Sequence, residues 1–192
     1  IALSLVGSEM CIRDSSFNAV PFFTFTKEML AFDPAGYSLK WYEDFFTNLN
    51  WQGAVQNSVI IAIFSTLIST TLGTLAALGL SRAQMPYRTL IMSILISPMI
   101  VPLIISAAGM FFFYSRIGIQ GTHIAVILAH AALGTPFVVI TVTATLSGFD
   151  NNLIRASPSL GAPPSTTFFR VIVPLITPGV ISGALFAFIT SF

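Results

Sequence analysis

The sequence predicts an all-α fold, a polytopic bundle of helices that cross a membrane. Of its 192 residues, 55% are hydrophobic and only 8% are charged, and the mean hydropathy is +0.88. Soluble domains carry about 25% charged residues, so a soluble fold is excluded. Charges are absent from four long stretches, at residues 45–81, 89–115, 117–149 and 171–192. Each is long enough to span, because a helix of roughly 20 apolar residues crosses a hydrocarbon core of about 30 Å.

Within these stretches the spans are expected near residues 57–80, 89–114, 123–147 and 178–192. Buried strands are a poor alternative, since the apolar runs do not alternate with period two and open strands leave backbone groups unpaired in lipid. We expect the last span to be cut short at Phe192. We expect the chain to be a fragment that lacks at least one helix at each end.

The positions of Lys and Arg predict the orientation of the spans, because cytoplasmic loops carry an excess of both. Loop 81–88 carries two arginines and no acid, and loop 148–177 carries two arginines against one Asp. Both loops are expected in the cytoplasm. Segment 27–44 has two lysines against four acids, a net charge of −2, and it should lie outside with the turn around Gly118. Spans must alternate between sides, and the four assignments agree.

The first 56 residues differ from the rest of the chain. Residues 1–15 start with an apolar run that is too short to span, is interrupted by Glu9 and lacks a signal-peptide layout. We expect them to be a scar of sequence assembly. Residues 16–56 should lie outside, and the mixture of aromatic, charged and amide residues at 38–51 favours a helix at the outer interface. An ordinary aromatic loop is the alternative.

Enzyme, metal and nucleic-acid chemistry find no support in the sequence. It contains no HExxH zinc pair, no GxSG serine motif and no GxxxxGK[ST] phosphate loop, and its only lysines, Lys27 and Lys40, lie outside the spans. The single Cys11 makes neither an internal disulfide nor a thiolate cluster. Eight basic residues against seven acidic ones give no electrostatic case for nucleic acid. We expect no catalytic residue, metal or cofactor.

Two histidines leave one transport alternative open. His123 and His130 are seven residues apart and share a helix face, as the members of a proton relay would. No carboxylate lies in any predicted span, which counts against an ion-coupled carrier. A neutral histidine bonded to a backbone carbonyl is the structural alternative for each.

Small residues and prolines mark how the spans pack and bend. Gly179, Gly183 and Ala187 recur every four residues in the last span, a spacing that lets helix backbones approach closely. Pro98 and Pro102 remove backbone donors from the second span and should kink it. Such a kink is a candidate mark of a gate or of a helix that lines the transport path.

Loop 148–177 is long for a connection between membrane helices, and its pattern predicts a helix-turn-helix. Asparagines at 151–152 are expected to cap a first helix that ends at Gly161. Prolines at 163–164 open a second helix that runs to Pro174. Its apolar side cannot bury itself in so small a unit, which favours docking of a soluble partner. A packed loop without a partner is the alternative.

This loop resembles the cytoplasmic EAA loop of the permeases of binding-protein-dependent ABC transporters. The family pattern is EAA, three residues, Gly, nine residues, a branched apolar residue, one residue and Leu-Pro. In this sequence it reads Arg155-Ala156-Ser157, Gly161, Val171 and Val173-Pro174. The flanking segments are similar to the subgroup that includes spermidine and putrescine permeases, so the likeness covers residues 16–192.

The resemblance implies a permease domain at residues 57–192 in the bacterial inner membrane. It implies three partners: a dimer of separate ABC ATPase subunits, a second permease subunit and an extracytoplasmic solute-binding protein. The loop would insert into the ATPase, whose closure rocks the membrane helices between inward-open and outward-open states. The solute would be a polyamine or a similar small molecule.

The resemblance also assigns roles in the loop. Ala156 and Gly161 would form the tight turn, and Phe168, Val171 and Pro174 would join it to the bundle. Two residues depart from the pattern, with Arg155 in place of Glu and Ser157 in place of the second Ala. A guanidinium reverses any ion pair that the motif carboxylate makes with the ATPase. Two other functions stay open: an ion-coupled secondary transporter, and a membrane anchor or scaffold subunit.

Overall fold

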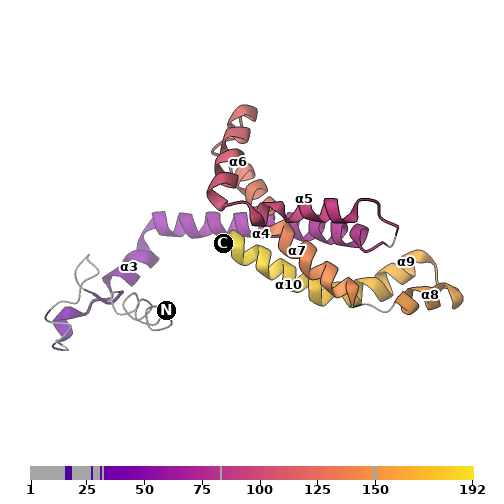
Figure 1. Cartoon of the computed structure of the whole chain (residues 1–192). Coiled ribbons are helices and arrows are strands. Elements are labelled where there is room, and N and C mark those ends of the chain that lie inside the picture. Colours follow the sequence, from indigo (N-terminus) through magenta and orange to yellow (C-terminus); the bar gives the residue numbers. More distant parts are fainter. Residues whose placement is uncertain (1–15, 19–26, 28–30, 32, 83, 149–150) are drawn as a thin grey trace. The chain divides into compact units, whose positions relative to one another are not determined.

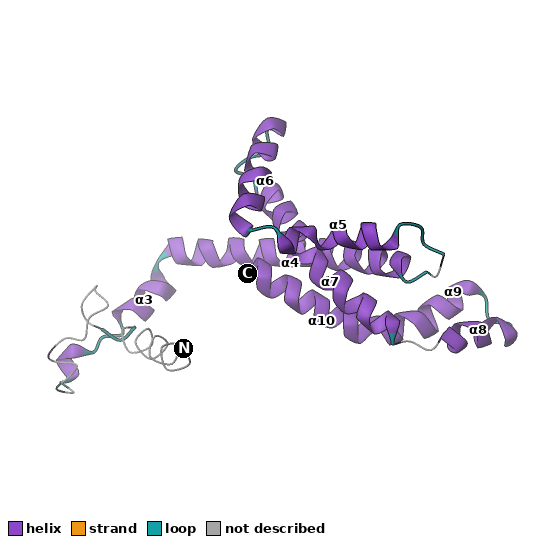
Figure 2. Cartoon of the chain, viewed as in Figure 1, coloured by secondary structure: helices purple, strands orange, loops and turns teal. Residues whose placement is uncertain are grey.

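A computed structural model of the chain describes residues 16–192 except 19–26, 28–30, 32, 83 and 149–150 (Figure 1). These residues form helices, turns and loops, and their one pairing of extended residues is an isolated bridge between Asn18 and Tyr37 (Figure 2). The all-α prediction is confirmed for this part of the chain. The chain divides into two compact units, Ile1–Gln56 and Asn57–Phe192. The scar predicted at residues 1–15 lies outside the described residues.

The first unit contains η1 (Pro34–Gly36), α3 (Lys40–Thr47) and the start of α4 (Leu49–Leu80). The interface helix predicted at 38–51 is split at Asn48. Asn48 has an extended backbone, and its side-chain oxygen accepts a hydrogen bond of 3.0 Å from the backbone N–H of Asn50. It therefore ends α3 and caps α4, the position that asparagine favours.

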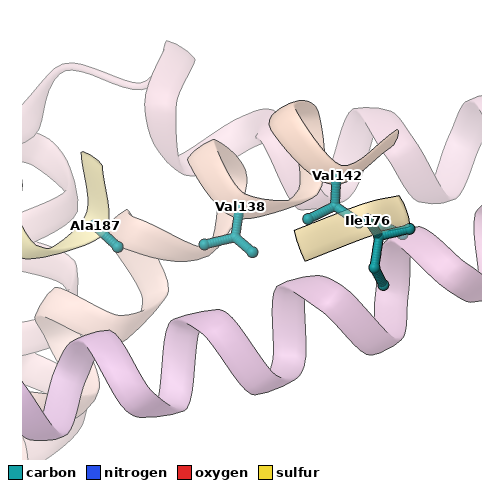
Figure 3. Close-up of a cluster of buried hydrophobic side chains, with 5 residues drawn as sticks. Val138, Val142, Ile176 and Ala187 are labelled. Atoms are coloured by element: carbon teal, nitrogen blue, oxygen red, sulfur yellow. The ribbon is translucent and has the colours of Figure 1, made fainter. Parts of the chain in front are cut away.

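Among the described residues, three unbroken apolar helical runs are long enough to cross a membrane: α4, α7 (His123–Ser147) and the run Pro164–Ser191, which ends in α10 (Val173–Ser191). They meet around a buried cluster of small and branched side chains, of which Figure 3 labels four. The cluster consists of Ala77, Val138, Val142, Ile176 and Ala187. The core of the second unit is therefore the contact between these three runs.

Contacts between α4 and α7 show that the two helices run in the same direction. The Ser69 hydroxyl donates a 3.0 Å hydrogen bond to the carbonyl of Ala131, and one turn further along α4, Gly73 faces Val138. At the start of both helices the His123 ring lies 3.3 Å from the Asn57 amide oxygen. If both helices span, the chain between them must cross the membrane back.

The helix α10 runs against α7. Gly134 of α7 lies beside Ala187, whereas further along α7 Val138 lies beside Gly183. At the far end of α10, the Ser191 and Ser65 hydroxyls are 2.5 Å apart, which ties α10 to α4. The helices α4 and α7 therefore run in one direction and α10 runs in the opposite direction. These directions match those expected of spans that cross a membrane alternately.

The second predicted span, 89–114, is broken into α5 (Arg88–Ile100) and α6 (Leu103–Ile117), which are bent by 100°. The break falls at Val101, which has an extended backbone, and Pro102, which has a ψ of 130° and so is not helical either. Proline disfavours the helical conformation of the residue before it and cannot donate to the preceding turn. Because α4 and α7 are parallel, this bent pair would carry the chain back across the membrane if both of those helices span it.

The structure extends the predicted last span toward its N-terminus. After α8 (Asn151–Ser159), a continuous helical run joins α9 (Pro164–Thr167), the π-helical turn η2 (Phe168–Ile172) and α10. The predicted stop at Pro174 does not occur. The N–H of Val173 bonds the carbonyl of Phe168, five residues back, so the wider π turn accommodates the proline ring without ending the helix.

The helix α7 begins with a side-chain cap. Thr122 has an extended backbone, and its hydroxyl accepts a 3.3 Å hydrogen bond from the N–H of Ala125. We expect Thr122→Ala to lower the stability of the full-length protein by about 1 kcal/mol, because it leaves a helix donor unpaired. Thr122→Ser keeps the acceptor and should keep the stability. Unfolding of the detergent-solubilised protein in denaturant checks this, and equal midpoints for the two variants would contradict it.

Candidate functional site

The candidate site is the helix-turn-helix of residues 151–167, which follows α7 and includes α9, the start of the run that ends in α10. Because α4 and α7 are parallel, their C-terminal ends lie at one end of the second unit, and this segment follows α7 there. Arg82, Arg88 and Arg170 are exposed at the same end. An excess of arginine is typical of the cytoplasmic side of a membrane protein.

A tight turn at Gly161 closes the first helix. The N–H of Gly161 bonds the carbonyl of Pro158 at 2.9 Å, and the N–H of Ala162 bonds the carbonyl of Ser157 at 3.2 Å. Gly161 has a φ of +76°. This pair of bonds around a left-handed glycine is a Schellman motif, which satisfies the last carbonyls of a helix. The sequence prediction of a helix end at Gly161 agrees with this geometry.

A hydrogen bond between two buried hydroxyls joins the helices of the motif. Ser157 is 9% exposed and Thr167 is 6% exposed, and their oxygens are 2.6 Å apart. Thr167 did not stand out in the sequence, because nothing in a spacing of ten residues pairs two hydroxyls until the turn between them is known. Ser157, which departs from the EAA pattern, thus has a defined partner here.

The remaining predicted coupling residues fall into two groups. Ala156 is exposed on α8, and the side chain of Arg155 lies outside the described residues. Phe168 and Val171 are half-buried in η2, and Pro174 is exposed in the first turn of α10. The exposed Ala156 is available to a partner, and the second group leads into the membrane helix.

Large apolar side chains of the motif and of the adjoining η2 remain uncovered. Leu160 at the turn is 86% exposed and Phe169 in η2 is 68% exposed. Exposed apolar side chains next to polar ones are typical of a docking surface.

The residues predicted to pack and bend the spans lie in two places. Gly179 and Gly183 are buried against α7, where a Cβ on Gly183 would lie 2.5 Å from the Thr141 hydroxyl oxygen. Pro98 lies within α5 without breaking it, and Pro102 begins α6 after the bend. The glycines therefore hold α10 against α7, and only Pro102 lies at the break.

The two histidines have different surroundings. His123 is exposed and faces Asn57, whereas the Nδ1 atom of His130 is buried without a hydrogen-bond partner among the described residues. Within the same described part of the chain, no three His, Cys, Asp or Glu side chains gather closely enough to hold a metal ion.

A polar stripe on α4 escaped the sequence analysis. Thr66, Thr70 and Thr74 are four residues apart, and their hydroxyl oxygens are buried without a hydrogen-bond partner within the described residues. Thr71 on the same helix instead bonds the carbonyl of Leu67 at 2.9 Å. The sequence does not show which threonines lack a backbone bond, because threonine in a membrane helix usually bonds its own backbone.

Comparison with known proteins places the chain in a family. Residues 69–192 match the model described as "Binding-protein-dependent transport system inner membrane component". The chain is 32% identical over 168 residues to the spermidine/putrescine transport system permease protein PotC of Haemophilus influenzae, with 88% of this chain and 65% of the relative covered.

Two other relatives are named for solutes other than polyamines. The molybdenum transport system permease protein ModB of Mycobacterium bovis is 30% identical over 154 residues, which cover 73% of this chain and 58% of ModB. The osmoprotective compounds uptake permease protein GgtD of Synechocystis sp. is 30% identical over 148 residues, which cover 77% of this chain and 50% of GgtD.

The chain spans between half and two thirds of the length of these relatives. The match nevertheless includes the EAA-like loop and the apolar helices on both sides of it, so the family indicated by the sequence resemblance is confirmed. The chain belongs to the family of inner-membrane components of binding-protein-dependent transport systems.

Proposed function

We propose that this chain is part of a permease subunit of an ATP-driven importer, and that its helix-turn-helix docks a separate ABC ATPase. The observation that carries the proposal is the Schellman turn at Gly161, which holds the exposed Leu160 at the tip of the motif. A rigid turn with an apolar tip, at the arginine-rich end of the helices, suits insertion into a cleft of a soluble partner. ATP hydrolysis belongs to that partner, because the chain has no phosphate loop.

The continuous helical run supports a route for the motion. Closure of the ATPase dimer would displace α8, and the run from Pro164 to Ser191 would carry the displacement into the membrane without a flexible joint. The glycines of α10 would pass it to α7. The unbonded hydroxyls of Thr66, Thr70 and Thr74 on α4 are suited to line the solute path, where water or solute replaces the missing partners.

We further propose a polyamine or a similar small solute as the substrate, together with a second permease subunit and an extracytoplasmic solute-binding protein. The name of PotC supports the polyamine, and the names of ModB and GgtD support the wider class of small solutes. Uptake by cells that keep the full-length permease but lack the ATPase tests the proposal. Persistent uptake would favour an ion-coupled carrier, and unchanged uptake after deletion of the permease would favour an anchor.

Docking depends on the conformation at Gly161. Its φ of +76° is costly for a β-branched residue, but no atom of the described residues lies within 4 Å of where a Cβ would sit. We expect Gly161→Val to strain the turn by about 1–2 kcal/mol and to lower the ATPase recovered with the full-length permease about tenfold. Gly161→Asn is the matched control, because asparagine tolerates this conformation. Equal recovery of ATPase with both variants would count against docking through this turn.

A further inference from the structure

The bond between Ser157 and Thr167 joins two elements that the chain itself connects only through the turn. Ser157 lies in the second half of α8, and Thr167 is the last residue of α9, immediately before η2. Both side chains are more than nine-tenths buried, and their oxygens are 2.6 Å apart. A hydrogen bond between two buried hydroxyls is costly to break on one side, because the remaining hydroxyl is left unsatisfied.

Ser157 is held to the second helix in two ways. Its carbonyl accepts the N–H of Ala162, which closes the turn, and its hydroxyl meets Thr167 beyond the turn. The Thr167 oxygen also lies 3.4 Å from the carbonyl of Pro163. When Thr167 donates to that carbonyl, Ser157 donates to Thr167, and each hydroxyl hydrogen has an acceptor. The bond therefore fixes where α8 lies on α9.

The position of Thr167 gives the bond a mechanical consequence. Thr167 belongs to the uninterrupted helical run Pro164–Ser191 of the second unit. A displacement of α8 reaches α10 through this bond without passing through the turn at Gly161. An apolar contact would let the two helices slide, whereas a hydrogen bond restricts both distance and direction.

We propose that the Ser157–Thr167 hydrogen bond is a positioning contact that transmits displacement of α8 to α10, so that it couples ATP hydrolysis to solute movement. This inference rests on the proposed function. The EAA pattern has alanine where this chain has Ser157, and alanine cannot make the bond. The contact is therefore a property of this chain's loop and not of the general pattern.

The test uses the full-length permease, assembled with its ATPase, second permease subunit and binding protein in proteoliposomes. Thr167→Val removes the hydroxyl and keeps the shape, Ser157→Ala removes the partner, and Thr167→Ser restores a hydroxyl. The matched control is Thr177→Val, because the Thr177 hydroxyl bonds its own helix, at the carbonyl of Val173. Three quantities are measured: recovered ATPase, basal ATP hydrolysis, and solute transported per ATP hydrolysed.

We expect Thr167→Val and Ser157→Ala to lower solute transported per ATP hydrolysed about fivefold, the equilibrium effect of roughly one hydrogen bond, and by a larger factor than any fall in recovered ATPase. The double variant should be no worse than either single variant, and Thr167→Ser and Thr177→Val should behave as the unmodified protein. An unchanged ratio in Thr167→Val, additive losses, or a loss of assembly that parallels the loss of transport would overturn the proposal. Absence of ATP-dependent uptake by the unmodified complex would instead refute the proposed function.

Discussion

Replacing Gly183 with leucine is expected to prevent α10 from packing on α7 and to leave little folded full-length protein. A Cβ at this position would lie 2.5 Å from the Thr141 hydroxyl oxygen and 2.8 Å from the Val138 Cα. The second of these is a backbone atom, so the contact can be relieved only if the helices move apart. Overpacking of a close contact costs about 1–3 kcal/mol, and a residue as large as leucine should reach at least the upper value.

The matched control is Gly109→Leu on α6. In the part of the chain that the structure describes, no atom lies within 4 Å of a Cβ built at Gly109, and an exposed helix position tolerates substitution within about 0.5 kcal/mol. Size-exclusion of the detergent-solubilised proteins, with their thermal unfolding midpoints, measures the difference. If Gly183→Leu elutes and unfolds as Gly109→Leu does, the close approach of α10 and α7 is not required for folding.

The sequence predicted that α10 packs closely against another helix, but not that this helix is α7. A four-residue repeat of small residues indicates close helix packing, but it does not say which helix lies opposite. Thr141 and Thr145 of α7 meet the glycines of α10, and threonines in apolar helices carry no pattern that marks them as partners. Contacts of this kind are set by how the spans assemble and not by local sequence.

The helix-turn-helix was predicted best where a local rule applies. Gly161 followed by two prolines indicates a helix end and a new start, and the structure has both. The rule failed at Pro174, where the π turn before it lets the helix continue. The expected kink at Pro102 became a bend of 100°, because the sequence indicates that a helix breaks there but not the angle at which it resumes.

The second large effect concerns the side of the membrane on which two loops lie. Single cysteines at Gln84 and Gln120, both exposed, are introduced into the full-length protein with Cys11 replaced by serine. In intact cells a membrane-impermeant maleimide should label Gln120→Cys and not Gln84→Cys. Both should be labelled after permeabilisation. The arginines near residue 84 favour the cytoplasmic side.

The expectation follows from the direction of two helices. The contacts between α4 and α7 follow the same order along both helices, so the two helices run in the same direction. In chain order they are Asn57 with His123, Ser69 with Ala131, and Gly73 with Val138. Two parallel spans in one chain require a crossing between them, and residues 84 and 120 flank the only segment that can make it. A re-entrant α5–α6 pair would put both cysteines on one side and would require α4 and α7 to be antiparallel. Labelling of both cysteines in intact cells, or of neither, would therefore contradict the packing of the spans and not only the assignment of the loops.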